Sequence, residues 1–123
     1  MIEIREGEVI EILEVKSNLT KVKLITADKE RVGINYNQLT GSIEVGDQVV
    51  VNTTATSLKL GTGGYDFILW IKGSKPQLND KGHIMKLRYS PYQLQTCSVA
   101  EQESPYHNQV KEFKSLAQIP VVV

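Results

Sequence analysis

The chain has 123 residues, which is enough for one domain with a real core and an appendage but too few for two full domains. Its 41% hydrophobic and 23% charged residues are typical of a globular protein and exclude a disordered or fibrous class. Fourteen basic residues balance fourteen acidic ones, and this balance disfavours general nucleic-acid binding, which usually needs a basic excess.

The single cysteine and the hydropathy of the chain narrow the class of protein further. Cys97 is the only cysteine, so an intrachain disulfide and a zinc site made of several thiolates are both excluded. We interpret it as a small buried thiol in a strand, because only His83 and His107 could serve as its base. The N-terminus lacks the basic start and apolar run of a signal peptide, and no stretch is long enough to span a membrane. We therefore expect a cytoplasmic protein.

The first half of the chain predicts five short strands. They are expected near residues 7–15, 20–26, 32–36, 48–52 and 65–71, each rich in β-branched or aromatic residues and bounded by turn signals. In the second strand Val22 and Leu24 alternate with Lys21 and Lys23, which is typical of a half-buried strand in a hairpin. Polar residues over 35–41 predict a loop or a single helical turn. The fifth run is apolar on both faces, so it should be central or should carry Trp70 on a covered face.

Strand number and spacing predict a mainly β protein: a small five-stranded OB-like or SH3-like barrel over residues 1–73. The remaining residues 74–123 are expected to be an extension that begins with a polar linker containing glycine and proline. Within it we expect strands near 83–89 and 94–99 that form a hairpin, and a short helix near 105–117, started by Ser104 and Pro105. The apolar run 119–123 is interpreted as the start of a truncated following domain in a longer protein.

A glycine cluster, Gly61-Thr62-Gly63-Gly64, is the first candidate ligand site. Consecutive main-chain N–H groups without side chains can hold an anion such as phosphate. The cluster lacks the Gly-Lys-Ser/Thr ending of a P-loop, and a strand rather than a helix is expected after it. A tight connection between strands with positive φ angles is therefore the favoured interpretation.

His83, Lys86 and Arg88 are the second group of candidate ligand-binding residues. If residues 83–89 are extended, Lys86 and Arg88 lie on one face and form a two-point contact for a carboxylate or phosphate. A solvated strand face is the simpler interpretation, and a single histidine without a partner rarely does chemistry.

The predicted barrel also carries the aromatic residues Tyr36, Tyr65, Phe67 and Trp70. On the surface of an OB-like barrel such residues stack nucleic-acid bases, although they belong more often to the core. We find no arrangement of residues that indicates a catalytic site, a metal site or a cofactor.

Several phrases of the sequence are distinctive in combination. They are Leu39-Thr40-Gly41, Gly46-Asp47, Val51-Asn52-Thr53-Thr54-Ala55, Leu60-Gly61-Thr62-Gly63-Gly64-Tyr65 and Gly82-His83-Ile84-Met85-Lys86-Leu87-Arg88-Tyr89-Ser90-Pro91. Over most of its length the chain thereby resembles the uncharacterised bacterial family catalogued as domain of unknown function 3866. This resemblance implies a longer protein in which a β-rich N-terminal part precedes an α/β part, and it implies no activity or functional residue.

Three functions stay open at this point. The leading hypothesis is a non-catalytic β-barrel that binds a protein partner or packs against the absent α/β part. The alternative is part of an enzyme site, in which the glycine cluster, Lys86 and Arg88 contact an anionic ligand bound mainly by the absent part. The third is an OB-like module for single-stranded nucleic acid, which the neutral charge disfavours. Pairing of residues 121–123 between chains would give a homo-oligomer.

Overall fold

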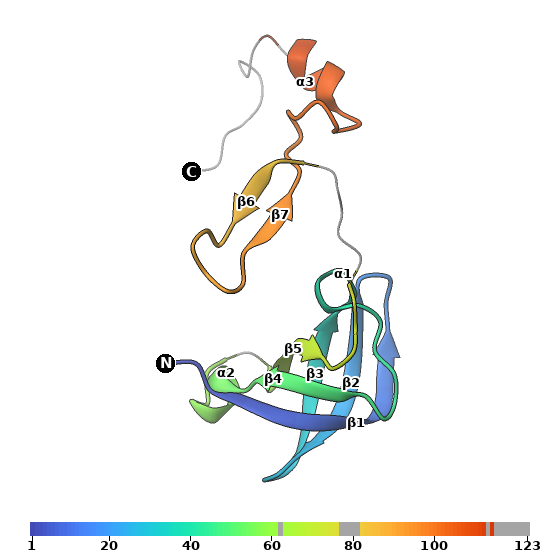
Figure 1. Cartoon of the computed structure of the whole chain (residues 1–123), viewed down its shortest axis with the longest axis vertical. Helices are drawn as coiled ribbons and strands as arrows, with labels where there is room; N and C mark the ends of the chain where they lie inside the picture. Colours follow the sequence, from blue (N-terminus) through green and yellow to red (C-terminus); the bar gives the residue numbers. More distant parts are fainter. Residues whose placement is uncertain (62, 77–81, 113, 115–123) are drawn as a thin grey trace. The chain divides into compact units, whose positions relative to one another are not determined.

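The computed structural model describes residues 1–61, 63–76, 82–112 and 114, which divide into two compact units, Met1–Gln77 and Leu78–Val123. The first unit is a closed barrel of five strands in the order β1-β2-β3-β5-β4 (Figure 1). Its strands are β1 (Ile4–Val15), β2 (Leu19–Thr26), β3 (Glu30–Tyr36), β4 (Gln48–Asn52) and β5 (Asp66–Ile71). All neighbours are antiparallel except β3 and β5, which run parallel, so the predicted five-stranded barrel is confirmed.

β1 closes the barrel because it is long and bent (Figure 1). Its first part pairs with β4 from Ile4 to Glu8, and its second part pairs with β2 from Gly7 to Val15. Two register shifts in the pairing with β2, between Val9 and Glu11 and between Ile12 and Glu14, mark bulges in this strand. Bulges bend a strand and increase its twist, which lets one strand serve both neighbours.

The core is built by β1, β2, β4, β5 and the loop before β4. In β2 the inward residues Val22 and Leu24 are fully buried, whereas Lys21 and Lys23 point outward, as the alternation predicts. Removing such side chains from water stabilises the fold by about 1.5–3 kcal/mol each. The core cluster consists of Val9, Val22, Leu24, Ile43, Val49, Val51, Ile68 and Ile71.

β3 contributes no residue to this core cluster. Its buried inner face carries Arg31, Gly33 and Asn35, whereas the apolar row of Val32, Ile34 and Tyr36 belongs to the outer face. Ile34 is buried although it faces outward, opposite Lys21 of β2 and Phe67 of β5. The strand that looks like an ordinary amphipathic strand in the sequence is therefore polar on the inside.

The single helical turn α1 (Asn37–Thr40) closes one end of the barrel through Asn35, whose side chain is fully buried. The Asn35 amide donates to Asn37 Oδ1 and to Gly41 O, both at 2.9 Å, and its oxygen accepts from the Thr40 hydroxyl at 2.5 Å. The polar stretch 35–41 thus forms the turn that was expected, because one buried amide bonds to three groups of that turn.

The fifth strand was expected to be central or to carry Trp70 on a covered face, and the first of these alternatives is observed. β5 lies between β3 and β4, and Trp70 is 50% exposed. Trp70 pairs with Val50 on the outer face, because Ile68 and Ile71 already occupy the inner face.

The second unit contains the expected hairpin, whose two strands are shorter than predicted, and the expected short helix. β6 (Ile84–Lys86) pairs antiparallel with β7 (Leu94–Thr96), and α3 (His107–Glu112) follows. β6 ends at Lys86 because Leu87 and Tyr89 have φ angles of 50° and 61°, which are not strand conformations. Cys97 is half-buried. The linker at 77–81, the end of the expected helix at 113 and 115–117, and the run 119–123 lie outside the described residues.

Candidate functional site

The two groups of predicted ligand residues lie in different units. Gly61, Gly63 and Gly64 belong to the connection between α2 (Thr54–Ser57) and β5 in the first unit, and Thr62 lies outside the described residues. Gly63 and Gly64 have φ angles of 69° and 80°, the conformation that the predicted tight connection requires. A strand follows them, so no helix N-terminus supports an anion there.

His83, Lys86 and Arg88 belong to the second unit and are all exposed. The His83 ring lies 3.8 Å from the Glu103 carboxylate, and Arg88 Nε donates to Met85 O at 3.4 Å. The alternation that would place Lys86 and Arg88 on one face ends at Leu87. A ligand role for these residues stays a prediction.

Sequence reasoning missed a buried charge network at the end of the barrel near α2. The side chains of Arg31 and Asp66 are only 4% and 2% exposed, and Arg31 Nη1 donates to Asp66 Oδ2 at 3.0 Å. Arg31 Nη2 donates to Asp28 Oδ2 at 2.8 Å, and Nε donates to the Thr26 hydroxyl at 3.1 Å. The Thr56 hydroxyl donates to the second oxygen of Asp66 at 2.5 Å. One guanidinium thus connects β2, the β2–β3 turn, α2 and β5.

The network also keeps the Asp28 carboxylate deprotonated. A hydrogen bond from the Thr26 hydroxyl, together with the bond from Arg31, holds the pKa of Asp28 well below its ordinary value of 3.8. The Asp28 carboxylate is partly exposed, and Arg5 Nη1 lies 3.8 Å from it. Asp28 therefore remains charged at any physiological pH.

Glu3 holds α2 against the start of β1. Its carboxylate accepts hydrogen bonds from the Ser57 hydroxyl at 2.9 Å and the Thr53 hydroxyl at 3.1 Å, and Arg5 donates to the same oxygen. The Glu3 N–H donates to the Thr54 hydroxyl at 2.8 Å. These bonds position α2, and thereby place Thr56 over Asp66.

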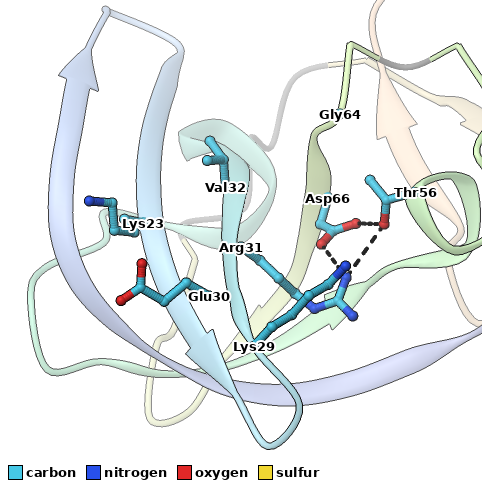
Figure 2. Close-up of a pocket in the computed structure, with 8 residues that line it drawn as sticks. All are labelled: Lys23, Lys29, Glu30, Arg31, Val32, Thr56, Gly64 and Asp66. Carbon is cyan, nitrogen blue, oxygen red and sulfur yellow. Dashed lines mark hydrogen bonds and ion pairs between the residues drawn. The ribbon is translucent and has the colours of Figure 1, made fainter.

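A surface hollow of about 340 Å³ lies beside the charge network. Figure 2 shows the side chains that line it. Arg31, Asp66 and Thr56 form one part of its wall, and Gly64 of the glycine cluster lies above them (Figure 2). We call it the hollow; its lining residues are Lys23, Lys29, Glu30, Arg31, Val32, Thr56, Gly64 and Asp66. Gly64, one of the predicted glycines, therefore lines the hollow together with Lys23 and Lys29. The sequence did not indicate these two lysines as ligand residues.

Aromatic side chains gather on the outer face of β3 and β5, beside Lys21 of β2. The rings of Tyr36 and Phe67 are parallel within 5°, with centroids 6.2 Å apart. Lys21 Nζ donates to the Tyr65 hydroxyl at 3.2 Å and lies 4.8 Å from the centre of that ring. We call this surface, made by Lys21, Ile34, Tyr36, Tyr65 and Phe67, the aromatic face. Tyr36 is 43% exposed, so the face offers ring surface to a ligand.

Comparison with known families matches residues 32–123 to the model of a protein of unknown function, DUF3866. The match covers about three-quarters of the chain, beginning inside β3. The chain belongs to the DUF3866 family. Comparisons with curated proteins and with solved structures found no match.

In the described ranges no three His, Cys, Asp or Glu side chains are grouped so that they could hold a metal ion, and no helix is long and apolar enough to cross a membrane. Arg31 and Asp66 bond to each other and to threonine hydroxyls, so they form a fixed wall. Among the described residues, the aromatic face and the hollow are two surfaces that are open to a ligand.

Proposed function

We propose that the barrel is a non-catalytic binding module whose aromatic face receives a protein partner. The observation that carries the proposal is the outward apolar row of β3. Val32, Ile34 and Tyr36 add nothing to the core cluster, and Tyr36 stacks on Phe67 at the surface. Aromatic side chains are enriched in protein interfaces because they bury a large rigid area.

The charges of this surface favour a protein over a nucleic acid. Lys21 Nζ lies 3.7 Å from the Glu14 carboxylate, and Lys23 Nζ lies 2.9 Å from that of Glu11. Binding to a phosphate backbone needs cations that release counterions, and here each outward lysine of β2 already has an acidic partner.

The strand order supports an OB-like assignment of the barrel. OB-folds are five-stranded Greek-key barrels that bind ligands on the faces of strands 2 and 3 and in the loops beside them, including the one between strands 4 and 5. The aromatic face lies on β2, β3 and β5, and the β4–β5 connection carries α2 and the glycine cluster.

Site-specific photo-crosslinking tests the proposal. We would place p-benzoylphenylalanine at position 36 or, as a control, at position 8, where Glu8 is also exposed on an outer face. We expect one protein to crosslink in cells from position 36 and not from position 8, and the crosslink to be lost with Phe67→Ser.

Three results would contradict the proposal. They are equal crosslinking from both positions, salt-sensitive binding of a labelled single-stranded oligonucleotide that Phe67→Ser abolishes, and substrate turnover by the purified chain.

A further inference from the structure

The hairpin of the second unit exposes large apolar side chains at the turn between β6 and β7, residues 87–93. Tyr89 is 100% exposed and Leu87 is 60% exposed. Met85 just before the turn and Tyr92 within it are exposed as well. A group of exposed apolar side chains this close together marks an interaction surface.

The turn has a defined main-chain conformation that keeps Leu87 and Tyr89 in solvent. Their φ angles of 50° and 61° are unfavourable for residues with bulky side chains. The Ser90 hydroxyl stabilises this path, because it donates to Leu87 O at 2.8 Å and accepts from the Tyr92 N–H at 3.2 Å. Residues held in this conformation cluster at functional sites, so we take the exposure of this turn as a feature with a use.

The charge of the hairpin is exclusively positive. Residues 84–96 contain Lys86 and Arg88 and no aspartate or glutamate. Neither cation forms an ion pair with any described residue, and Arg88 Nε donates only to Met85 O, at 3.4 Å.

The acidic residues that follow the hairpin are engaged at its open end, away from the turn. Glu101 accepts hydrogen bonds from the main-chain N–H groups of His83 and Ser98, at 3.1 Å and 3.3 Å. Glu103 accepts one from the Gly82 N–H, and the His83 ring lies 3.8 Å from it. The other described Lys, Arg, Asp and Glu residues of this unit are Lys111 and Glu112 of α3 and Lys114 beyond it. The turn therefore presents positive charge that no described acid of its unit pairs with.

A lipid surface with anionic headgroups fits this turn better than a protein or a nucleic acid. Cations and apolar residues alternate directly in Lys86-Leu87-Arg88-Tyr89. Long basic side chains can reach lipid phosphates while their apolar neighbours enter the headgroup boundary, where tyrosine is enriched. The cores of protein interfaces are depleted of lysine, and leucine offers no ring on which a nucleic-acid base could stack.

We propose that the β6–β7 turn binds the surface of a membrane that contains anionic lipids. Leu87 and Tyr89 enter the headgroup region, and Lys86 and Arg88 contact lipid phosphates. Apolar insertion and charge act together here, because either one alone gives only marginal membrane binding. The proposal concerns the second unit and does not rest on the aromatic face, so either can fail alone.

Co-sedimentation of the full chain with vesicles tests the proposal. Vesicles of phosphatidylcholine are compared with vesicles of equal parts phosphatidylcholine and phosphatidylglycerol. Each cation near an anionic surface strengthens binding about fivefold, so two cations should give about 25-fold higher affinity for the anionic vesicles. This difference should shrink as the salt concentration rises. No binding to the anionic vesicles, or equal affinity for both kinds, would overturn the proposal.

A charge variant locates the contact. Lys86→Gln should lower the affinity for anionic vesicles about fivefold. Lys111→Gln removes the same charge from α3 and should leave the affinity unchanged. Equal losses for the two variants would assign the binding to net charge and refute the role of the turn.

A tyrosine variant tests the apolar insertion. Tyr89→Ser should weaken binding about fivefold, which corresponds to about 40 Å² of apolar surface left in water. Tyr106→Ser is the matched control, because Tyr106 is an exposed tyrosine of the same unit outside the turn. Unchanged affinity of Tyr89→Ser would refute insertion.

Three other probes separate the competing ligands. They are polyglutamate, a labelled single-stranded oligonucleotide and inorganic phosphate, each titrated into the ¹⁵N-labelled full chain. Amide shifts at Lys86 and Arg88 with one of these probes, in a chain that does not bind anionic vesicles, would reassign the turn to that ligand and overturn the lipid proposal.

Discussion

Replacement of Arg31 by methionine tests the buried charge network most directly. Arg31 and Asp66 are both almost fully buried, so Arg31→Met leaves the Asp66 carboxylate in the protein interior without its cation. Among the described side chains, only the Thr56 hydroxyl then remains as a hydrogen-bond donor to Asp66. Breaking a buried pair from one side costs about 3–5 kcal/mol, and because the Thr56 bond is retained we expect a loss of about 3 kcal/mol in unfolding free energy.

Urea unfolding of the full chain, followed by far-ultraviolet circular dichroism, measures this loss. The denaturant slope should stay unchanged, so that the shift in midpoint reports stability alone. Lys72→Met is the matched control, because Lys72 and Glu6 form an ion pair of 3.4 Å whose side chains are 51% and 74% exposed. That change should cost less than about 0.5 kcal/mol.

A double variant separates the destabilisation caused by an unpaired buried charge from the destabilisation caused by lost packing. Arg31→Met combined with Asp66→Leu removes both charges, so it should be less destabilising than Arg31→Met alone. If Arg31→Met costs less than about 1 kcal/mol, or if the double variant costs the sum of its parts, the argument from buried charge is refuted.

Three further changes probe the inside of the barrel and its acid stability. Gly33→Ala should lower the free energy of unfolding in urea by about 1–3 kcal/mol, because the added Cβ would lie 2.6 Å from Leu24 Cδ2. Gly61→Ala is the control and should be neutral, because no atom lies within 4 Å of its added Cβ. Equal losses for the two variants would contradict this prediction. Asn35→Ala should cost about 1–3 kcal/mol by leaving buried partners unbonded, and a Tm unchanged from the natural chain would refute the role given to this amide. The pKa of Asp28 is lowered on folding, so its contribution to stability is present above its ordinary value of 3.8 and declines as the pH falls below that value. Below about pH 4 the Tm of Asp28→Asn should therefore fall less steeply than that of the natural chain, and parallel curves would contradict it.

The local alternation of polar and apolar residues, together with turn residues, was sufficient to predict the strands and turns of the barrel. The alternation of Lys21, Val22, Lys23 and Leu24 predicts both the strand and its faces, because charged side chains stay in water. The hairpin of the second unit was predicted too long at β6, since the pattern of residues 83–89 does not reveal that Leu87 and Tyr89 adopt positive φ. Such φ values depend on the fold around a residue more than on its type.

The charge network could not be predicted because it depends on pairing between distant strands. Arg31 and Asp66 are 35 positions apart, and only the barrel brings them within 3.0 Å. A signal was present nevertheless. Arg31 stands directly before the predicted strand 32–36, and Asp66 stands directly before the apolar run of β5. Two opposite charges at strand positions of one barrel are candidates for a buried pair.

The inner face of β3 links the fold to the aromatic face. Gly33 leaves space that Leu24 and Ile68 fill, while Arg31 and Asn35 bond to polar groups on either side of it. Because neighbouring strands supply the core, the apolar residues of β3 are free to face outward and form part of the aromatic face. The aromatic face thus follows from a strand whose polar side is buried.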